Sequence, residues 1–325
     1  MTRILGVLGL LVVLYTTLIT SHPKAGEPDN LISVANLQGR FGIITLGAAL
    51  VIIVGGIDLS IGAVVGCSAV LFGVLMNKGV HPFAAVPIVI LFGATVGLTN
   101  GSLITRLKLQ PFLVTLCGMF VFRGFARLLG GTLGQASVIE GHPEYKDPIR
   151  TLRHLLIGKD PIDGELIFPA QFILLIVLAG LVGFFLHRTA YGRYWYAIGH
   201  SELAAKYAGV NVSRQRVVIY VVCSALAALT GVLLFLDAPS VQSDNAGFSW
   251  ELYAILGAVL GGCSLRGGEG TAVGMVLGAM VLPVLESLVN FRGDASDVIP
   301  VVIGLTLLIG AIVDELIRQR SRIHR

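Results

Sequence analysis

Long apolar runs that hold few charged residues follow one another through the sequence. A run of about 20 such residues can cross a membrane as a helix, because the rise per residue is about 1.5 Å and the hydrocarbon core is about 30 Å thick. The candidate spans are residues 4–20, 39–57, 60–76, 84–104, 111–129, 169–187, 216–236, 251–265, 271–290 and 298–315. This pattern predicts an all-α polytopic membrane protein with about ten transmembrane helices. Eight crossings are the alternative if the glycine-rich segments re-enter the membrane instead of crossing it.

The composition agrees with burial in lipid. Charged residues make up 13% of the 325 residues, whereas a soluble domain carries about 25%. The net charge of +4 does not point to a nucleic-acid partner. The cysteines all lie inside apolar runs and form no CxxC pair, which argues against a metal site or a disulfide framework and favours small buried side chains.

Cationic residues predict the orientation, because they gather on the cytoplasmic side of membrane spans. With the N-terminus inside, the cytoplasmic segments hold Arg3, Arg106, Lys108, Arg188, Arg193, Lys206, Arg214, Arg216, Arg266, Arg318, Arg320, Arg322 and Arg325. The short external connections hold only Lys24, Arg40, Lys78 and Arg292, and Arg123 and Arg127 lie near a helix end on that side. We therefore expect both termini in the cytoplasm. Residues 4–20 are expected to remain as a first span, since no small-residue cleavage site follows them.

Two polar loops divide the apolar runs of this single domain, residues 1–325. The external loop 130–168 contains one helix-like run, residues 149–156, with an apolar face. This loop is interpreted either as a lid or docking surface, or as a spacer that rests on the lipid headgroups. The cytoplasmic loop 188–216 is too polar to span, yet it has apolar and small residues at helical spacing. That spacing predicts a short amphipathic helix outside the bilayer.

A helix break is predicted at Gly55-Gly56, directly before Asp58 and Ser60. Paired glycines interrupt a helix and leave backbone groups that need partners. An Asp at mid-membrane costs about 2.5–3.5 kcal/mol, which suggests a role. One hypothesis is that Asp58 and Ser60 cap the following helix. The other is that they line a polar path for a hydroxylated solute.

A similar glycine pattern recurs later in the chain. Gly55-Gly56, Gly62 and Gly66 match Gly267-Gly268, Gly274 and Gly278 at identical offsets, and each set follows a Leu-Gly-Ala helix. This indicates an internal repeat of the kind common in transporters, with coincidence in a glycine-rich chain as the alternative. It also predicts a second helix break at Gly267 and Gly268.

Neutral polar side chains within or beside the spans suit an uncharged, hydroxyl-rich ligand, because each can donate or accept a hydrogen bond. The candidate pathway residues are Asp58, Ser60, Asn100, Thr115 and Ser264. The sequence contains no Walker A motif, no zinc-protease HExxH motif and no GxSxG elbow. We therefore expect no catalytic residues, no metal and no cofactor bound by this chain, and we expect a transporter component instead of an enzyme.

Several motifs together resemble the permeases of bacterial monosaccharide ABC importers of the ribose, xylose and galactofuranose type. Residues 55–62 (GGIDLSIG) are similar to the signature of that family. So are residues 110–119 (QPFLVTLCGM) with 122–124 (FRG), and residues 188–193 (RTAYGR) with 196–199 (YAIG). Residues 261–262 with 267–271 (GGEGT) complete the resemblance, which covers about residues 36–313 in the family's order.

The resemblance implies a type II ABC importer-like permease in the bacterial inner (plasma) membrane that translocates a monosaccharide. It implies three partners besides the lipid bilayer: a separate ATPase subunit that uses ATP, a second permease copy as homodimer or heterodimer, and a periplasmic sugar-binding protein. It also implies that residues 190–215 form the coupling helix that docks into the ATPase. The coupling residues are Tyr196, Ala197, Ile198, Gly199, Ala204, Ala205 and Gly209. His200-Ser201 departs from the Asn-type residue common in the family at this place.

A stand-alone secondary carrier or facilitator for a small polar solute is the alternative function, because it would share the repeat and the helix breaks. Intramembrane Lys, His and acid pairs of the proton-relay kind are nearly absent, apart from Asp58, Glu269 and Glu286, which weighs against a proton-driven carrier. A membrane scaffold without transport is a weaker alternative, since it needs no polar helix breaks. The sequence does not name the sugar.

Overall fold

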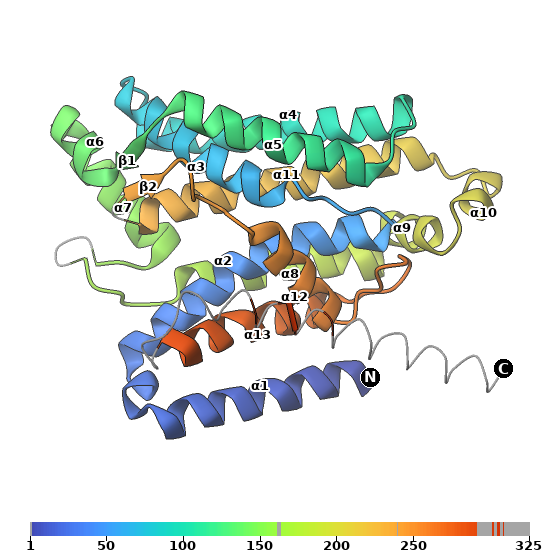
Figure 1. Ribbon diagram of the computed structural model, residues 1–325, viewed down its shortest axis with the longest axis horizontal. Helices are drawn as coiled ribbons and strands as arrows, with labels where there is room; N and C mark the ends of the chain where they lie inside the picture. Colours follow the sequence, from blue (N-terminus) through green and yellow to red (C-terminus); the bar gives the residue numbers. More distant parts are fainter. Residues whose placement is uncertain are drawn as a thin grey trace.

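A computed structural model describes residues 2–160, 164–238 and 240–290, together with 301, 304, 305 and 308. Within these residues the long helices run side by side as one bundle (Figure 1). They are α1 (Thr2–Ser21), α2 (Pro28–Ile53), α3 (Ile61–Asn77), α4 (Pro82–Arg106), α5 (Pro111–Leu129), α8 (Ala170–Arg188), α11 (Val212–Asp237), α12 (Trp250–Leu260) and α13 (Ala272–Asn290). Each predicted span from 4–20 to 271–290 thus corresponds to one helix, and most of the predicted span 298–315 lies outside the described residues.

Helix length and composition agree with a membrane protein. In the described part of the chain, six helices are long and apolar enough to cross a bilayer: α2, α4, α5, α8, α11 and α13. Three of these begin with a proline in the first turn, namely Pro28, Pro82 and Pro111. Proline suits that position because its fixed backbone angle matches the helix and its missing N–H would have no partner there. Local sequence therefore sets where these helices start.

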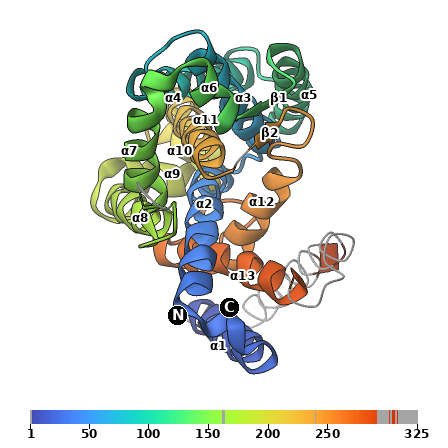
Figure 2. The same cartoon turned by 90° about the vertical axis from the view of Figure 1, so that its left-hand side faces the viewer.

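Helix α2 lies at the centre of the bundle, with α3, α4 and α5 on one side and α1 and α13 on the other (Figure 2). Its side chains from Gln38 to Ile53 are buried. Helix α11 packs against α2, α3 and α4. The contact with α4 is close because a Cβ added at Gly97 would lie 2.2 Å from the carbonyl oxygen of Tyr220. Small residues permit such backbone approach where lipid supplies no hydrophobic drive for association.

The start of α2 differs from the prediction. The expected span began at residue 39, and Arg40 was expected in an external connection, but α2 begins at Pro28 and contains Arg40 as a buried residue. The expectation was wrong because Asn36 and Arg40 find hydrogen-bond partners inside the protein. Paired polar side chains allow the helix to continue past the end of the apolar run.

Helix α12 is also shorter than the predicted span 251–265. It contains 11 residues, which cover about 16 Å or about half of the hydrocarbon core. It ends at Leu260 with Gly261 as its C-cap, and the following Gly262 adopts a left-handed φ of +89°. By itself α12 is too short to cross, so the chain needs the segment that follows to continue through the membrane.

The loop 130–168 forms a cap on one end of the bundle. It contains the short helices α6 (Gln135–Gly141), η2 (Pro143–Tyr145) and α7 (Lys146–Ile157). Helix α7 includes the predicted run 149–156 and buries the apolar face of Ile149 and Leu152. The strand β1 (Thr132–Gly134) pairs antiparallel with β2 (Ser240–Gln242). The sequence did not predict this pair, because a strand of three residues is too short to show alternation.

The opposite end of the bundle carries α9 (Ala190–His200) and α10 (Glu202–Tyr207) (Figure 1). The start of α1 lies toward that same end (Figure 1). Two short helices thus replace the single short helix predicted in the loop 188–216, and residues 212–216 already belong to α11. This region is separated by the length of the bundle from the cap 130–168.

Candidate functional site

Two helix breaks lie next to each other although they are far apart in the sequence. The first, residues 54–60, joins α2 to α3, and the second, residues 261–271, joins α12 to α13. The backbone N–H of Gly268 donates to the carbonyl oxygen of Ile53 at 2.8 Å. A Cβ added at Gly267 would lie 3.0 Å from the backbone nitrogen of Gly55. Gly55 and Gly267 have φ of +76° and +87°, which favours glycine at both positions.

Helix α9 is the third part of this contact. A Cβ added at Gly199 would lie 1.9 Å from the Ile53 carbonyl oxygen and 2.2 Å from the Gly268 nitrogen. Only a glycine fits there without movement of the backbone. The hydroxyl of Tyr196, one turn earlier, donates to the carbonyl oxygen of Gly270 at 2.7 Å. Burial raises the pKa of Tyr196 to about 12, so its phenol keeps this proton at neutral pH.

We call Gly55, Gly199, Gly267 and Gly268 the glycine junction. The structure thus brings together three of the predicted helix-break glycines and the predicted coupling residue Gly199. Gly56, the fourth break residue, faces another way, since a Cβ there would lie 2.8 Å from the hydroxyl oxygen of Tyr220 in α11. A shift of α9 would displace both helix breaks directly, because only backbone atoms lie between α9 and the two breaks.

The other predicted coupling residues divide between two faces. Ile198 and Ala205 are buried against the bundle, and Tyr196 and Ala197 are half-buried. Ala204 and Gly209 are exposed, Gly209 in the turn after α10 with a φ of +81°. The large hydrophobic side chains exposed on α10 are Leu203 at 62% and Tyr207 at 84%, which are four residues apart and therefore share one face. The sequence analysis counted Tyr207 among the apolar and small residues at helical spacing, but it did not select Leu203, and it placed neither residue in the coupling set.

Four of the five predicted pathway residues meet at the start of α3. Asp58 Oδ1 accepts from the backbone N–H of Ser60 at 2.8 Å and from its hydroxyl at 2.6 Å. The amide of Asn100 in α4 donates to Ser60 Oγ at 3.2 Å. Thr115 in α5 donates to the carbonyl oxygen of Ile57 at 3.3 Å. We call Asp58, Ser60, Asn100 and Thr115 the polar cluster, and each of them is at most 4% exposed.

Ser264, the fifth predicted pathway residue, lies in the other helix break. Its backbone N–H donates to the carbonyl oxygen of Glu269 at 3.3 Å, and its hydroxyl accepts from the backbone N–H of Arg266 at 3.2 Å. These contacts organise the turn that carries Gly267 and Gly268. The predicted set is therefore divided between the two breaks that form the glycine junction.

The polar cluster has neighbours that sequence reasoning missed. Tyr220 and Cys223 in α11 lie beside Asp58, and Glu251 in α12 lies close by. One oxygen of Glu251 pairs with Arg123 at 3.1 Å. Among the described residues, Asp58 Oδ2, the Tyr220 hydroxyl and Glu251 Oε2 are buried without a hydrogen-bond partner. A charged residue at the edge of an apolar run was the signal that would have identified Glu251.

The hydrogen bonds of Asp58 support a structural role in the turn before α3. Asp58 accepts two hydrogen bonds from Ser60 and thereby fixes the turn ahead of α3. Ser60 occupies the N-cap position, although its own side chain makes no capping bond. The second carboxylate oxygen of Asp58 is left for another partner. The hypothesis that Asp58 orders the start of α3 thus concerns Oδ1, and the hypothesis that Asp58 lines a solute path concerns Oδ2.

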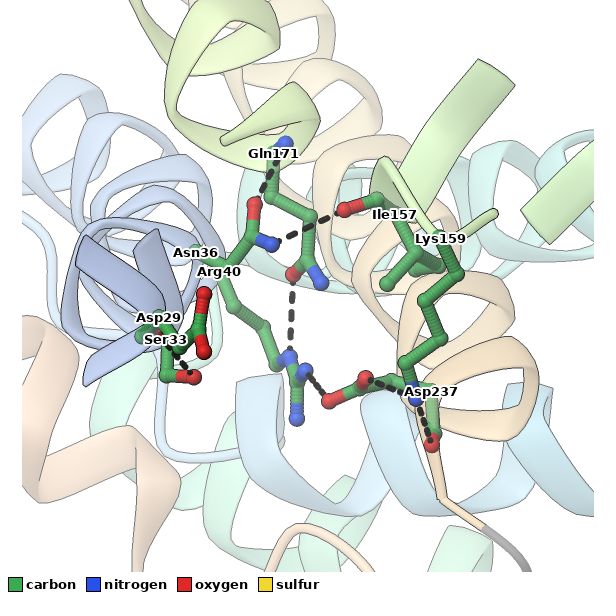
Figure 3. A network of polar contacts seen from close by, with 8 residues as sticks. All are labelled: Asp29, Ser33, Asn36, Arg40, Ile157, Lys159, Gln171 and Asp237. Atoms are coloured by element: carbon green, nitrogen blue, oxygen red, sulfur yellow. Dashed lines mark hydrogen bonds and ion pairs between the residues drawn. The ribbon is translucent and has the colours of Figure 1, made fainter. Parts of the chain in front are cut away.

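An ion-pair network joins the helices at the end that carries α7 (Figure 3). The guanidinium of Arg40 in α2 pairs with the carboxylate of Asp237 at the end of α11. Arg40 Nε also donates to the side-chain oxygen of Gln171 in α8 at 3.1 Å. Lys159, which follows α7, pairs with the same carboxylate at 3.1 Å. Asp237 therefore holds two cations from different segments.

A second pair of hydrogen bonds completes this network (Figure 3). The Asn36 amide donates to the carbonyl oxygen of Ile157 at 2.8 Å, and its oxygen accepts from the backbone N–H of Gln171 at 3.0 Å. Both bonds are buried. The network thus fixes α2, α8, α11 and the segment after α7 to one another, at the opposite end of the bundle from α9.

No group of three or more His, Cys, Asp or Glu side chains with a metal-binding arrangement occurs among the residues that the structure describes. The polar cluster instead offers one carboxylate, two hydroxyls and an amide. Such groups recognise hydroxylated, uncharged molecules by hydrogen bonding.

Comparison with known proteins identifies relatives that match most of the chain. Residues 30–311 match the family described as branched-chain amino acid transport system / permease component. The ribose import permease protein RbsC of Bacillus subtilis is 34% identical over 94% of this chain and 91% of that protein. The fructose import permease protein FruG of Bifidobacterium longum is 34% identical over 82% of this chain and 77% of that protein. RbsC of Escherichia coli K12 is 31% identical over 94% of this chain. No solved structure matches the chain.

Proposed function

Since this chain belongs to the branched-chain amino acid transport system / permease component family, we propose that it is the membrane subunit of an ATP-driven importer that carries a monosaccharide. The chain is a multi-pass membrane protein and a transporter component, as its family and its apolar helices show. The curated relatives that import ribose and fructose support a sugar as the cargo.

The glycine junction is the observation that carries this proposal. Helix α9 contacts both helix breaks through backbone atoms, and the first break leads into the polar cluster within five residues, from Gly55 to Ser60. A push on α9 and α10 therefore moves the helices that flank the cluster. Such rigid-body movement is how a bundle alternates between two packed states.

The partner that pushes is proposed to be a separate ATPase subunit. Leu203 and Tyr207 present an exposed apolar face on α10, at the end of the bundle. Beside them is a groove of about 680 Å³ between residues 104–111 and 202–216, which contains Lys108 and Lys206. A short amphipathic helix with an exposed apolar face fits a groove on another protein. We propose that α10 enters such a groove on the ATPase.

The polar cluster is proposed to line the sugar path in another conformation. Its members are almost fully buried, so the solute reaches them only after helices move apart. Helix α5, which supplies Thr115, exposes much of its surface. Only 22% of its apolar membrane-spanning stretch is buried inside the protein. That exposed surface is proposed to face a second permease copy, with the path between the two.

The remaining assignments follow from the same proposal. A periplasmic binding protein delivers the sugar to the end that carries α7, and both termini lie in the cytoplasm with α9. The excess of cations in the segments at the α9 end, such as Arg188, Arg193 and Arg214, supports this orientation.

The test uses the full chain co-expressed with a candidate ATPase subunit encoded in the same genome. We expect Leu203→Asp to reduce co-purification of the ATPase and ATP-driven sugar uptake in proteoliposomes at least ten-fold. Leu155→Asp is the matched control, because Leu155 is 57% exposed on α7 at the opposite end of the bundle. We expect this control to bind the ATPase as the unmodified chain does.

Two results would overturn the proposal. One is that Leu203→Asp and Leu155→Asp reduce co-purification of the ATPase equally. The loss would then be a general effect of the added charge and would not locate the ATPase at α10. The other is uphill sugar uptake by the purified chain alone under an ion gradient, which would establish the secondary carrier.

A further inference from the structure

An apolar groove that contains no residue of the polar cluster or of the glycine junction lies between α8 and α11. It has a volume of about 450 Å³ and its floor reaches Leu50 of the central helix α2. One wall is a stripe of α8 that includes Leu181 and Phe185, and the other is α11 from Arg214 to Leu226. Volumes of this size hold small-molecule ligands in other proteins.

The groove has one charged end. Arg214, in the first turn of α11, lines it together with Trp195 and Tyr191 of α9. Trp195 donates to the side chain of Gln215 at 2.9 Å, so these two polar groups satisfy each other. The guanidinium of Arg214 has no ion-pair partner in the part of the chain that the structure describes. Arg214 is therefore the free charge at this end.

The length of the groove matches one leaflet of a bilayer. Arg214 and Leu226 lie 12 positions apart on α11, which corresponds to about 18 Å along the helix axis, and half of the hydrocarbon core is about 15 Å. Aromatic residues such as Trp195 and Tyr191 prefer the level of the lipid headgroups. The groove thus runs from the headgroup level toward the middle of the membrane.

We propose that this groove is a binding site for one anionic phospholipid, with an acyl chain between α8 and α11 and the phosphate at Arg214. An acyl chain matches the apolar walls, and an anionic headgroup matches the unpaired guanidinium. The lipid then contacts Trp195 of α9 and Leu50 of α2. These two helices meet at the glycine junction. Binding would therefore stabilise the packing of α9 on the bundle.

A second copy of this chain is the other occupant to consider. The unpaired guanidinium of Arg214 and the groove length of one leaflet favour the lipid. Binding of a second protein copy requires neither feature. The side chains on the α8 wall are open to the membrane, with Leu181 53% and Phe185 44% exposed. Lipid therefore reaches the groove without any rearrangement.

The test measures lipid that remains with the purified chain. The full-length protein is reconstituted in bilayers of phosphatidylglycerol and phosphatidylethanolamine at a ratio of one to three, re-extracted in mild detergent and analysed by mass spectrometry. We expect about one tightly held phosphatidylglycerol per chain. Arg214→Gln should lower its enrichment about five-fold, the equivalent of about 1 kcal/mol for one cation at an anionic surface.

Three further variants separate the groove from general effects. Leu181→Trp should fill the groove and remove the tightly held lipid. Ile176→Trp is its control, since Ile176 is 47% exposed on another face of α8 and does not line the groove. Arg193→Gln is the control for charge, because Arg193 is exposed on α9 outside the groove. Both controls should retain the lipid.

The proposal is overturned if the unmodified chain shows no enrichment of phosphatidylglycerol, or if Arg214→Gln and Arg193→Gln lose it equally. It is also overturned if Leu181→Cys forms disulfide-linked dimers in the membrane in high yield, which would place a second copy at the groove. None of these readouts depends on an ATPase or on sugar uptake, so the result is independent of the transport proposal.

Discussion

The backbone N–H of Gly268 donates a hydrogen bond of 2.8 Å to the carbonyl oxygen of Ile53, the last residue of α2. This bond joins the end of the central helix to a helix break that lies in the last quarter of the chain. Gly199 of α9 lies against both partners, and no side chain separates the three segments. Because this contact consists of backbone, it is sensitive to the addition of even one methyl group.

Gly199→Ala should abolish sugar uptake and displace α9 from the two helix breaks. The added Cβ would lie 1.9 Å from the Ile53 carbonyl oxygen, so the backbone has to move. Uptake in proteoliposomes and the ATPase rate of the complex check this prediction. Gly180→Ala in α8 is the control, because a Cβ there meets nothing within 4 Å. It should be neutral or stabilise the protein by up to about 1 kcal/mol. Normal uptake by Gly199→Ala would contradict the role of the junction.

Tyr196→Phe should weaken the contact of α9 with the second break by about 1 kcal/mol, because it removes the hydrogen bond to the Gly270 carbonyl. The pKa of Tyr196 is raised to about 12, above the ordinary value of 10. The stabilising proton is therefore fully present below pH 10, and the stability that depends on it falls as the pH rises from there toward 12.

Thermal unfolding of the detergent-solubilised protein between pH 6 and 9 measures the loss of stability and tests whether the phenol of Tyr196 stays protonated over this range. The difference in Tm between Tyr196→Phe and the unmodified chain should be constant over this range. A difference that disappears by pH 9 would show that the phenol ionises early and that burial does not protect it.

Asp58→Asn should be tolerated much better than Asp58→Ala. The amide oxygen of Asn can accept the two hydrogen bonds from Ser60, whereas Ala leaves both donors unsatisfied at a cost of about 1–3 kcal/mol. If transport requires only a hydrogen-bond acceptor at residue 58, the rate of sugar uptake by each variant should decrease in proportion to its loss of folding stability. A well-folded Asp58→Asn without uptake would instead show that the negative charge itself serves transport.

Asp237→Ala should destabilise the protein by about 3–5 kcal/mol, because it leaves the buried Arg40 without its counter-ion. Combining Arg40→Met and Lys159→Met with Asp237→Leu should restore most of that loss, since removal of all three charges leaves none of them unpaired. Asp244→Ala is the control, because the ion pair of Asp244 with Arg127 is exposed and contributes about 0–1 kcal/mol. Unfolding in detergent measures all of these variants. Equal effects of Asp237→Ala and Asp244→Ala would show that the network adds no stability.

The apolar runs located the helices because length and hydropathy are local properties. The predicted spans 84–104 and 111–129 correspond to Pro82–Arg106 and Pro111–Leu129, with ends set by residues that the sequence displays. The pairs Gly55-Gly56 and Gly267-Gly268 were also predicted as breaks, because glycine acts on its own backbone. Local chemistry was sufficient for these features.

Contacts between distant residues were not predictable in the same way. The polar cluster was selected as a set of polar residues in apolar spans, yet nothing in one sequence says that Asn100 faces Ser60 while Ser264 lies elsewhere. Arg40 was misplaced for the same reason, since its partners Gln171 and Asp237 are more than 100 residues away. The pairing of β1 with β2 likewise depends on where two loops meet in space.

The short length of α12 has a consequence for how a newly made chain enters the membrane. A helix of 11 residues covers only about half of the bilayer, so it has little tendency to remain there alone. Its buried face rests on α2 and α13. Helix α12 therefore has to be retained by helices that precede and follow it, and we expect insertion of this region to be completed only after α13 has been synthesised.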